Sequence, residues 1–158
     1  MKKFKLIGLI GITFMSLLFV TGCGNKNIEG SLEDIMAKVY TDIPQEERPM
    51  MLMNTEVTDE NIEYYLGTKD IEYEEALASE SGVGSIAHSV VLVRTKKNAD
   101  IEDIKTKIKE NINPRKWVCV GVEEDKVIVE NKGNLIILIM VEDENSRERL
   151  EEAFEKLK

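Results

Sequence analysis

The chain contains two residues with the chemistry of a catalytic pair, the thiol of Cys119 and the imidazole of His88, its only histidine. A thiolate nucleophile requires an exposed sulfur and a base within hydrogen-bonding distance. Both residues lie in segments with the composition of β-strands, so a sheet can bring them together. The alternative is that both are core residues, because His88 alternates with Val90 and Leu92 and Cys119 follows a valine. No Gly-x-Ser-x-Gly motif offers another nucleophile.

The other cysteine, Cys23, has the setting of a lipid attachment site. Val20-Thr21-Gly22-Cys23 resembles the lipobox of bacterial lipoproteins, in which the cysteine thiol takes a diacylglyceryl group and small residues expose the preceding bond to the processing peptidase. A basic start and the uncharged run Leu6–Val20 precede it. This run is shorter than the roughly 20 residues of a membrane-spanning helix. An ordinary secretory signal or an uncleaved anchor is the alternative.

These features predict three parts of the chain: a lipoprotein signal peptide (1–22), a lipidated tether and linker (23–30), and a single domain (31–158). Acyl chains on Cys23 then hold the mature protein at the extracytoplasmic face of the cell membrane. With Cys23 lipidated, Cys119 has no partner for an intramolecular disulfide.

The charge of the chain argues against nucleic acid as a partner. The precursor has 30 acidic and 21 basic residues and a net charge of −9. Removal of residues 1–22 takes away Lys2, Lys3 and Lys5 and no acidic residue, which brings the net charge to −12. Such a surface repels nucleic acid and anionic lipid headgroups. We therefore expect membrane attachment through the lipid on Cys23.

Met50, Met51 and Met53 form a cluster of thioether side chains. Thioethers suit Cu(I), but no histidine or cysteine lies near them in the sequence to complete a metal site. Methionines also line adaptable contact surfaces, and more often they fill gaps in a core. We expect an interaction patch here, with a core segment as the alternative.

Arg115, Lys116 and Trp117 form a basic and aromatic cluster in an otherwise acidic chain. Arginine and tryptophan dominate the binding energy of many interfaces, so this cluster is a candidate anchor for a protein or an anionic wall polymer. The alternative is the end of a helix, where cations complement the helix dipole and Trp117 packs in the core.

The sequence predicts no metal and no cofactor. Its acidic clusters lack the spacing and the turn glycine of an EF-hand. Phosphate-binding loops and zinc-type pairs of cysteine and histidine do not occur in the sequence.

Apolar stripes and capping residues predict four helices. Ser31, Thr58 and Asp100 are the expected N-caps of the first three, and Gly67 is the expected end of the second. Val57 can staple onto Ile62 at the start of that second helix. The expected ranges are 31–43, 58–66, 100–113 and about 146–157.

Runs rich in β-branched residues predict the strands, with a loop at Gly82–Gly84. The expected strands are 71–77, 86–94, 117–122, 127–130 and 135–141, and the state of 50–54 is undecided. Asn131-Lys132-Gly133-Asn134 predicts a hairpin between the last two. Leu135–Val141 is apolar at every position, which is typical of a strand covered on both faces, so we expect it at the centre of the sheet. The fold class is α+β, a mainly antiparallel four- to five-stranded sheet with helices packed against it.

The mature chain carries four motifs without chemical specificity: Pro49-Met50-Met51-Leu52-Met53-Asn54, Tyr65-Leu66-Gly67, Ala76-Leu77-Ala78-Ser79-Glu80 and Pro114-Arg115-Lys116-Trp117-Val118-Cys119-Val120. Together they resemble an uncharacterised family of small Gram-positive lipoproteins, a domain of unknown function. The resemblance implies a lipid-anchored single domain. It implies no activity, ligand or catalytic residue.

Two functions follow from these observations. The first is a non-enzymatic binding or accessory module of the cell envelope, whose partner is a protein or a wall component. The second is a hydrolase or thiol enzyme that uses Cys119 and His88. The lack of a convergent catalytic set favours the binding module.

Overall fold

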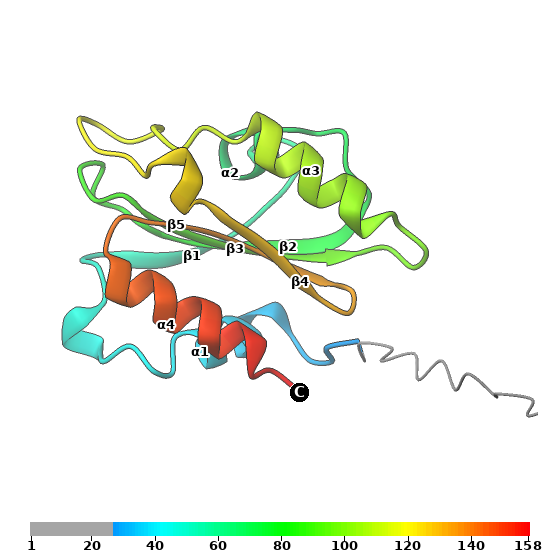
Figure 1. Cartoon of the computed structure of the whole chain (residues 1–158), viewed down its shortest axis with the longest axis horizontal. Helices are drawn as coiled ribbons and strands as arrows, with labels where there is room; N and C mark the ends of the chain where they lie inside the picture. Colours follow the sequence, from blue (N-terminus) through cyan, green and yellow to red (C-terminus); the bar gives the residue numbers. More distant parts are fainter. Residues whose placement is uncertain (1–26) are drawn as a thin grey trace, which may run out of the picture.

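The computed structural model describes residues 27–158. The expected signal peptide and Cys23 lie outside the described residues. The structure is a five-stranded sheet with helices on both faces (Figure 1), which confirms the predicted α+β class. The elements are α1 (Leu32–Val39), β1 (Leu52–Glu56), α2 (Ile62–Leu66), β2 (Tyr73–Ser81), β3 (His88–Thr95), α3 (Ile101–Asn111), β4 (Ile128–Lys132), β5 (Leu135–Val141) and α4 (Glu144–Glu155), with 3-10 turns at Gln45–Glu47 and Glu124–Lys126.

The strands lie in the order β1-β2-β3-β5-β4, and each neighbouring pair is antiparallel. Every residue of β5 is buried, as its apolar sequence predicts. The middle strand, however, is β3, and β5 lies next to it. A continuous apolar run shows that both faces of a strand are covered, but it does not report the position of the strand in the sheet.

Alternate residues of β5 contribute to two separate cores. Ile136, Leu138 and Met140 pack under α2, α3 and the loop that follows α3. Ile137 and Ile139 face α1 and α4 on the opposite side. This period of two divides the molecule into three layers (Figure 1).

Side-chain caps set the start of three helices. The Ser31 hydroxyl and the Asp100 and Asp143 carboxylates each accept a hydrogen bond from a backbone N–H three residues later. Ser31 and Asp100 are the predicted caps. Because Asp143 is the third cap, α4 begins two residues before the expected Ser146.

Helix α2 is shorter than predicted. It begins at Ile62, with Asn61 and not Thr58 as its N-cap. The Asn61 side chain accepts a hydrogen bond from the Thr58 N–H at 2.7 Å, which closes a local turn before the helix. Gly67 ends the helix in the left-handed region at φ 76°, as predicted.

Two expectations about strands are corrected. Residues 117–122 form an irregular loop and not a strand, held by single hydrogen bonds such as the one that Val118 N–H donates to Gly84 C=O at 2.7 Å. Cys119 has φ 62° there, which breaks the alternation that a strand needs. The undecided segment 50–54 enters strand β1, which is an edge strand because it pairs only with β2.

The described chain contacts the core from Ile28, inside the segment expected as linker. The Ile28 side chain is buried, and the Ile28 C=O accepts a hydrogen bond from Arg94 at 2.5 Å. Ile28 therefore belongs to the packed domain, although it lies inside the expected linker. None of the helices within residues 27–158 has the length and the apolar character needed to cross a membrane.

Candidate functional site

The two candidate interaction patches, about 60 residues apart in the sequence, meet at one end of the sheet. Met53 from β1 and Lys116, Trp117 and Val118 from the loop after α3 line one pocket of about 290 Å³. The strand order brings them together, because β1 pairs with β2 so that Met53 lies opposite Glu80, and Glu80 forms an ion pair with Lys116.

We define the methionine surface as the exposed side chains of Met50, Met51, Met53, Tyr64 and Val118. These are all the large apolar side chains that are exposed within residues 27–158. The three methionines are 70%, 62% and 54% exposed, so the core alternative is wrong, and the interaction patch stays a prediction. Exposed apolar side chains gathered in one place are typical of contact surfaces.

Two glycines keep the methionine surface open at the end of β2. A Cβ atom on Gly82 would lie 3.2 Å from Met53 Cε and 3.4 Å from Met51 Cε. A Cβ atom on Gly84 would lie 3.8 Å from Val118 Cγ2. The methionine side chains therefore lie over the backbone of Gly82, and the Val118 side chain lies over that of Gly84.

Lys116 is a buried cation below the methionine surface. Its side chain is 4% exposed, and its Nζ lies 2.6 Å from a carboxylate oxygen of Glu80. The same Nζ lies 4.1 Å from the ring centroid of Tyr64, 5.0 Å from that of Tyr65 and 5.2 Å from that of Trp117. Three aromatic faces and one carboxylate thus enclose the ammonium group.

The electrostatics of this cluster follow from its burial. Burial lowers the pKa of Lys116, and the hydrogen bond and negative charge of Glu80 oppose that shift. The Tyr64 hydroxyl donates a hydrogen bond to the second carboxylate oxygen of Glu80 at 2.6 Å. Burial and this carboxylate raise the pKa of Tyr64, so the phenol keeps its proton. The positive charge of Lys116 and the negative charge of Glu80 therefore balance each other beneath the apolar surface.

The structure revises the roles of the Arg115-Lys116-Trp117 cluster. Trp117 is 8% exposed and belongs to the core under α3, as the alternative interpretation expects. Lys116 pairs with Glu80 and does not cap a helix, since α3 ends at Asn111. Arg115 is exposed. The cluster as a whole is therefore not an exposed binding anchor.

Sequence patterns missed three members of this site. Tyr64 lies in the short helix α2, Val118 in the loop expected as a strand, and Glu80 in β2. The pairing of Glu80 with Lys116 spans 36 residues, and no local pattern reports a contact at that separation. The motif Ala76-Leu77-Ala78-Ser79-Glu80 includes Glu80, but its spacing carries no chemical signal.

The hydrogen bonds of β1 show which of its backbone groups face β2. The Gly82 N–H donates to the Met51 C=O at 3.0 Å, and the Val57 N–H donates to the Ala76 C=O at 2.9 Å. Hydrogen-bonded pairs alternate along an antiparallel ladder. The odd-numbered residues of β1 therefore direct their N–H and C=O groups toward β2.

The even-numbered residues of β1, Leu52, Asn54 and Glu56, direct their backbone groups away from the sheet. The Glu56 C=O accepts a hydrogen bond from the Asn61 side chain at 3.0 Å. For Leu52 and Asn54, no partner of the outward N–H and C=O groups occurs within residues 27–158. Part of this sheet edge is therefore open, directly beside the methionine surface.

The opposite sheet edge, β4, carries charged side chains. Lys105 from α3 lies 3.5 Å from a Glu130 carboxylate oxygen and donates to the Asn131 side chain at 3.1 Å. Lys132 donates to the backbone C=O of Glu155 at the end of α4. Such charges discourage strand addition at an edge. Of the two edges, β1 is thus the less protected against strand addition.

Cys119 and His88 do not form a catalytic pair in the structure. His88 is buried, and its Nε2 lies 2.8 Å from the hydroxyl of Tyr40, which belongs to the core facing α1 and α4. Cys119 lies in the loop that covers the opposite face of the sheet, beside Trp117. Cys119 is also exposed, so the alternative of a core position is wrong for this thiol. Its positive φ interrupts the extended backbone that the neighbouring valines favour.

No group of three histidine, cysteine, aspartate or glutamate side chains placed to hold a metal ion occurs within the described residues 27–158. No known protein family, curated protein or solved structure matches this chain. The resemblance to small Gram-positive lipoproteins therefore stays a prediction from the sequence.

Proposed function

We propose that this chain is a lipid-anchored binding protein of the cell envelope that captures an extended segment of a partner protein. The segment adds to the open edge of β1, and its apolar side chains contact the methionine surface. The observation that carries this proposal is the open edge at Leu52 and Asn54 beside the exposed Met53. Strand addition is a common mode of peptide recognition.

The lipid anchor is supported by the sequence before residue 27. The basic start, the short apolar run and Val20-Thr21-Gly22-Cys23 together match a lipoprotein signal. Two acyl chains on Cys23 suffice for stable anchoring of a protein whose mature charge repels anionic lipids. The binding surface then acts outside the cytoplasmic membrane.

The choice of a polypeptide partner rests on the chemistry of the edge. Outward N–H and C=O groups two residues apart match the spacing of another β-strand. A polysaccharide has no backbone amides at this repeat, so a wall glycan would leave the edge unsatisfied. Flexible methionine side chains accommodate partner side chains of different shapes.

A labelling experiment in cells tests the anchor. We expect the intact chain to incorporate radioactive palmitate and to fractionate with membranes, because the Cys23 thiol carries the lipid. The Cys23→Ala variant should incorporate none and accumulate as an uncut precursor. Processing of that variant at residue 22 together with unchanged membrane fractionation would show that the chain is not a lipoprotein.

A photo-crosslinking experiment tests the binding surface separately. A photoreactive amino acid replaces Met53 in intact cells, and the matched control replaces Glu110, which is exposed on α3. We expect a discrete crosslinked partner from position 53 and none from position 110. Asn54→Pro removes an outward N–H of β1, so it should abolish the crosslink.

A crosslink from position 53 that persists at full strength in the Asn54→Pro chain would contradict strand addition. Equal crosslinking from positions 53 and 110 would contradict a specific surface. The labelling of Cys23 is measured independently, so a failure of the proposed anchor can be distinguished from a failure of the proposed binding surface.

A further inference from the structure

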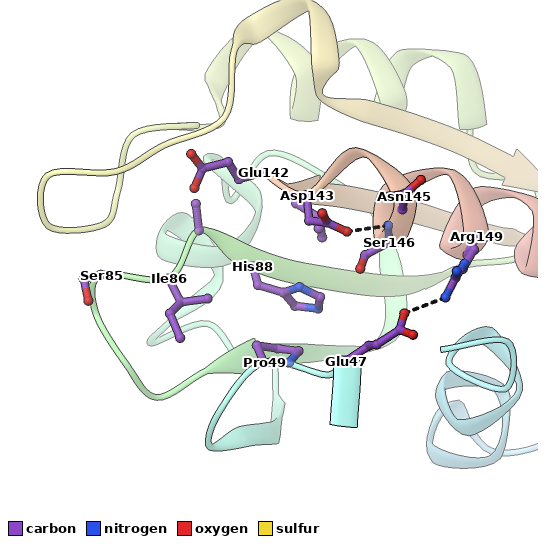
Figure 2. A pocket seen from close by; sticks show the side chains of 12 residues that line it. Glu47, Pro49, Ser85, Ile86, His88, Glu142, Asp143, Asn145, Ser146 and Arg149 are labelled. Carbon is purple, nitrogen blue, oxygen red and sulfur yellow. Dashed lines mark hydrogen bonds and ion pairs between the residues drawn. The ribbon is translucent and has the colours of Figure 1, made fainter. Parts of the chain in front are cut away.

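A second pocket, of about 820 Å³, lies on the face of the sheet that carries α1 and α4. Its walls come from the turn at Glu47–Pro49, the start of β3 and the start of α4 (Figure 2). It shares no lining residue with the pocket at the methionine surface. This volume is within the range of small-molecule sites, about 300–1,000 Å³.

His88 presents one free ring nitrogen to this pocket. The side chain is 5% exposed, and Nε2 is occupied by the Tyr40 hydroxyl at 2.8 Å. Nδ1 has no hydrogen-bond partner within residues 27–158. Among these residues, Trp117 Nε1 is the only side-chain nitrogen or oxygen atom that lacks both a partner and access to solvent, so Nδ1 has access to solvent. Nδ1 is therefore reached through the pocket, where Figure 2 shows the imidazole between Pro49 and Asp143.

Carboxylates dominate the charge around the imidazole. Asp143 lines the pocket, and its hydrogen bonds with Ser146 hold its pKa below the usual range, so the group is ionised. Glu142 lies further out at the rim (Figure 2). The only cation in the pocket wall, Arg149, is already paired with Glu47 at 2.7 Å. The lining carboxylates of Glu47, Glu142 and Asp143 outnumber this guanidinium, so the charged side chains of the pocket wall are net negative, although the N-terminus of α4 also stabilises Asp143.

The remaining wall is apolar. Pro49, Ile86, Ala87 and Val141 line the pocket beside the imidazole. The turn that carries Pro49 is held in place by Arg48, whose guanidinium donates to the backbone C=O of Tyr40 at 2.8 Å. An apolar wall next to an anionic group suits a ligand with a hydrocarbon part and a positive end.

We propose that this pocket binds a small organic ammonium ion. The ammonium group donates a hydrogen bond to His88 Nδ1 and faces the carboxylate of Asp143. The short hydrocarbon part of the ligand lies against Pro49 and Ile86. This site is independent of strand addition at β1.

The chemistry of His88 fits this role. Burial lowers its pKa to about 4, so the ring is neutral at pH 7 and does not repel a cation. A neutral imidazole has one donor and one acceptor nitrogen. An ammonium ligand requires the lone pair on Nδ1, and this places the proton on Nε2, where it is donated to the Tyr40 oxygen.

The single histidine makes a direct test available. The processed full-length protein carries ¹⁵N-labelled histidine, and its imidazole signals are followed by NMR at pH 7 while n-butylammonium chloride is added at constant ionic strength. We expect one saturable shift of Nδ1 and Nε2, with the nitrogen shifts of the Nε2-protonated tautomer in the bound state. The uncharged n-butanol and the anion n-butyrate should give no saturable shift.

Two isosteric variants complete the experiment. Asn is as good an N-cap as Asp, so Asp143→Asn keeps the start of α4 and removes only the charge. We expect it to weaken butylammonium binding by about tenfold. The matched control, Glu110→Gln on the other face of the sheet, should bind as the unmodified chain does.

The absence of a saturable shift with butylammonium would overturn the proposal. So would equal binding of n-butanol, which would indicate an apolar pocket without selectivity for a cation, or unchanged affinity in the Asp143→Asn chain. A negative result here leaves the crosslinking test of β1 unaffected, because the two pockets have different walls.

Discussion

Gly67, which ends α2, packs directly against the backbone of Asn111, the last residue of α3. A Cβ atom at position 67 would lie 2.4 Å from both the carbonyl carbon and the carbonyl oxygen of Asn111. The contact sets the position of α2, and α2 carries the Tyr64 ring over the ammonium group of Lys116. A close approach of two backbones thus supports the methionine surface.

Replacement of Gly67 should therefore be costly. Gly67→Ala adds a methyl group inside contact distance and also places alanine at φ 76°, so we expect a loss of about 3 kcal/mol in the free energy of unfolding. Urea denaturation measures it. Gly84→Ala, where the nearest atom to the new methyl would be 3.8 Å away, is the control and should change stability little. Equal effects of the two substitutions would contradict the packing argument.

Separating the buried ion pair should also destabilise the fold. Glu80→Gln leaves the 4% exposed Lys116 side chain without its carboxylate partner, and we expect a loss of about 3 kcal/mol. Lys116→Met should cost less, because Glu80 lines the pocket and can be hydrated. The double variant should lose less than the two single variants together. Additive effects in urea denaturation would show that the pair is not coupled.

His88 makes stability depend on pH. Its pKa is lowered from 6.5 to about 4 in the folded protein, mainly by burial. Between these values the unfolded chain binds a proton that the folded chain does not, so stability is complete above pH 6.5 and falls as the pH drops toward 4. At pH 5 the loss from this residue should be about 2 kcal/mol. Urea denaturation of the original and His88→Gln chains at pH 7 and 5 isolates this contribution, which must vanish in the variant.

The hydrogen-bond pattern of β1 predicts opposite outcomes for two neighbouring prolines. Thr55→Pro removes an N–H that faces Ala78 in β2, and it should cost about 3 kcal/mol or more. Asn54→Pro removes an outward N–H and should have a much smaller effect on thermal unfolding. If Asn54→Pro proves the more damaging of the two, the inferred direction of the open edge is wrong.

Local patterns predicted the parts of the fold that depend on neighbours along the chain. The caps Ser31 and Asp100, the stop at Gly67 and the hairpin after Asn131 each involve contacts within a few residues, so they can be recognised without the fold. The strand expected at 117–122 failed because its β-branched residues resemble a strand, whereas Cys119 has a positive φ that composition does not reveal.

The methionine surface depended more strongly on the tertiary structure. Met50, Met51 and Met53 were found from the sequence, but whether methionines lie in a core or on a surface depends on what packs over them. Within residues 27–158, more than half of each of these three side chains stays exposed. Lys116 was recognised as a cation, and only the fold shows that Glu80 neutralises it.

By itself, the sequence determined the fold class, the burial of both faces of Leu135–Val141 and the strongly acidic charge. The periodicity of apolar residues shows which faces of an element are buried, and the composition gives the net charge directly. It also contains Val20-Thr21-Gly22-Cys23, the motif resembling a lipobox on which the proposed anchor at Cys23 rests. The tertiary structure alone decided the strand order, the open edge of β1 and the separation of His88 from Cys119. These depend on contacts between residues far apart in the chain, and the energy of such contacts leaves no pattern in the local sequence.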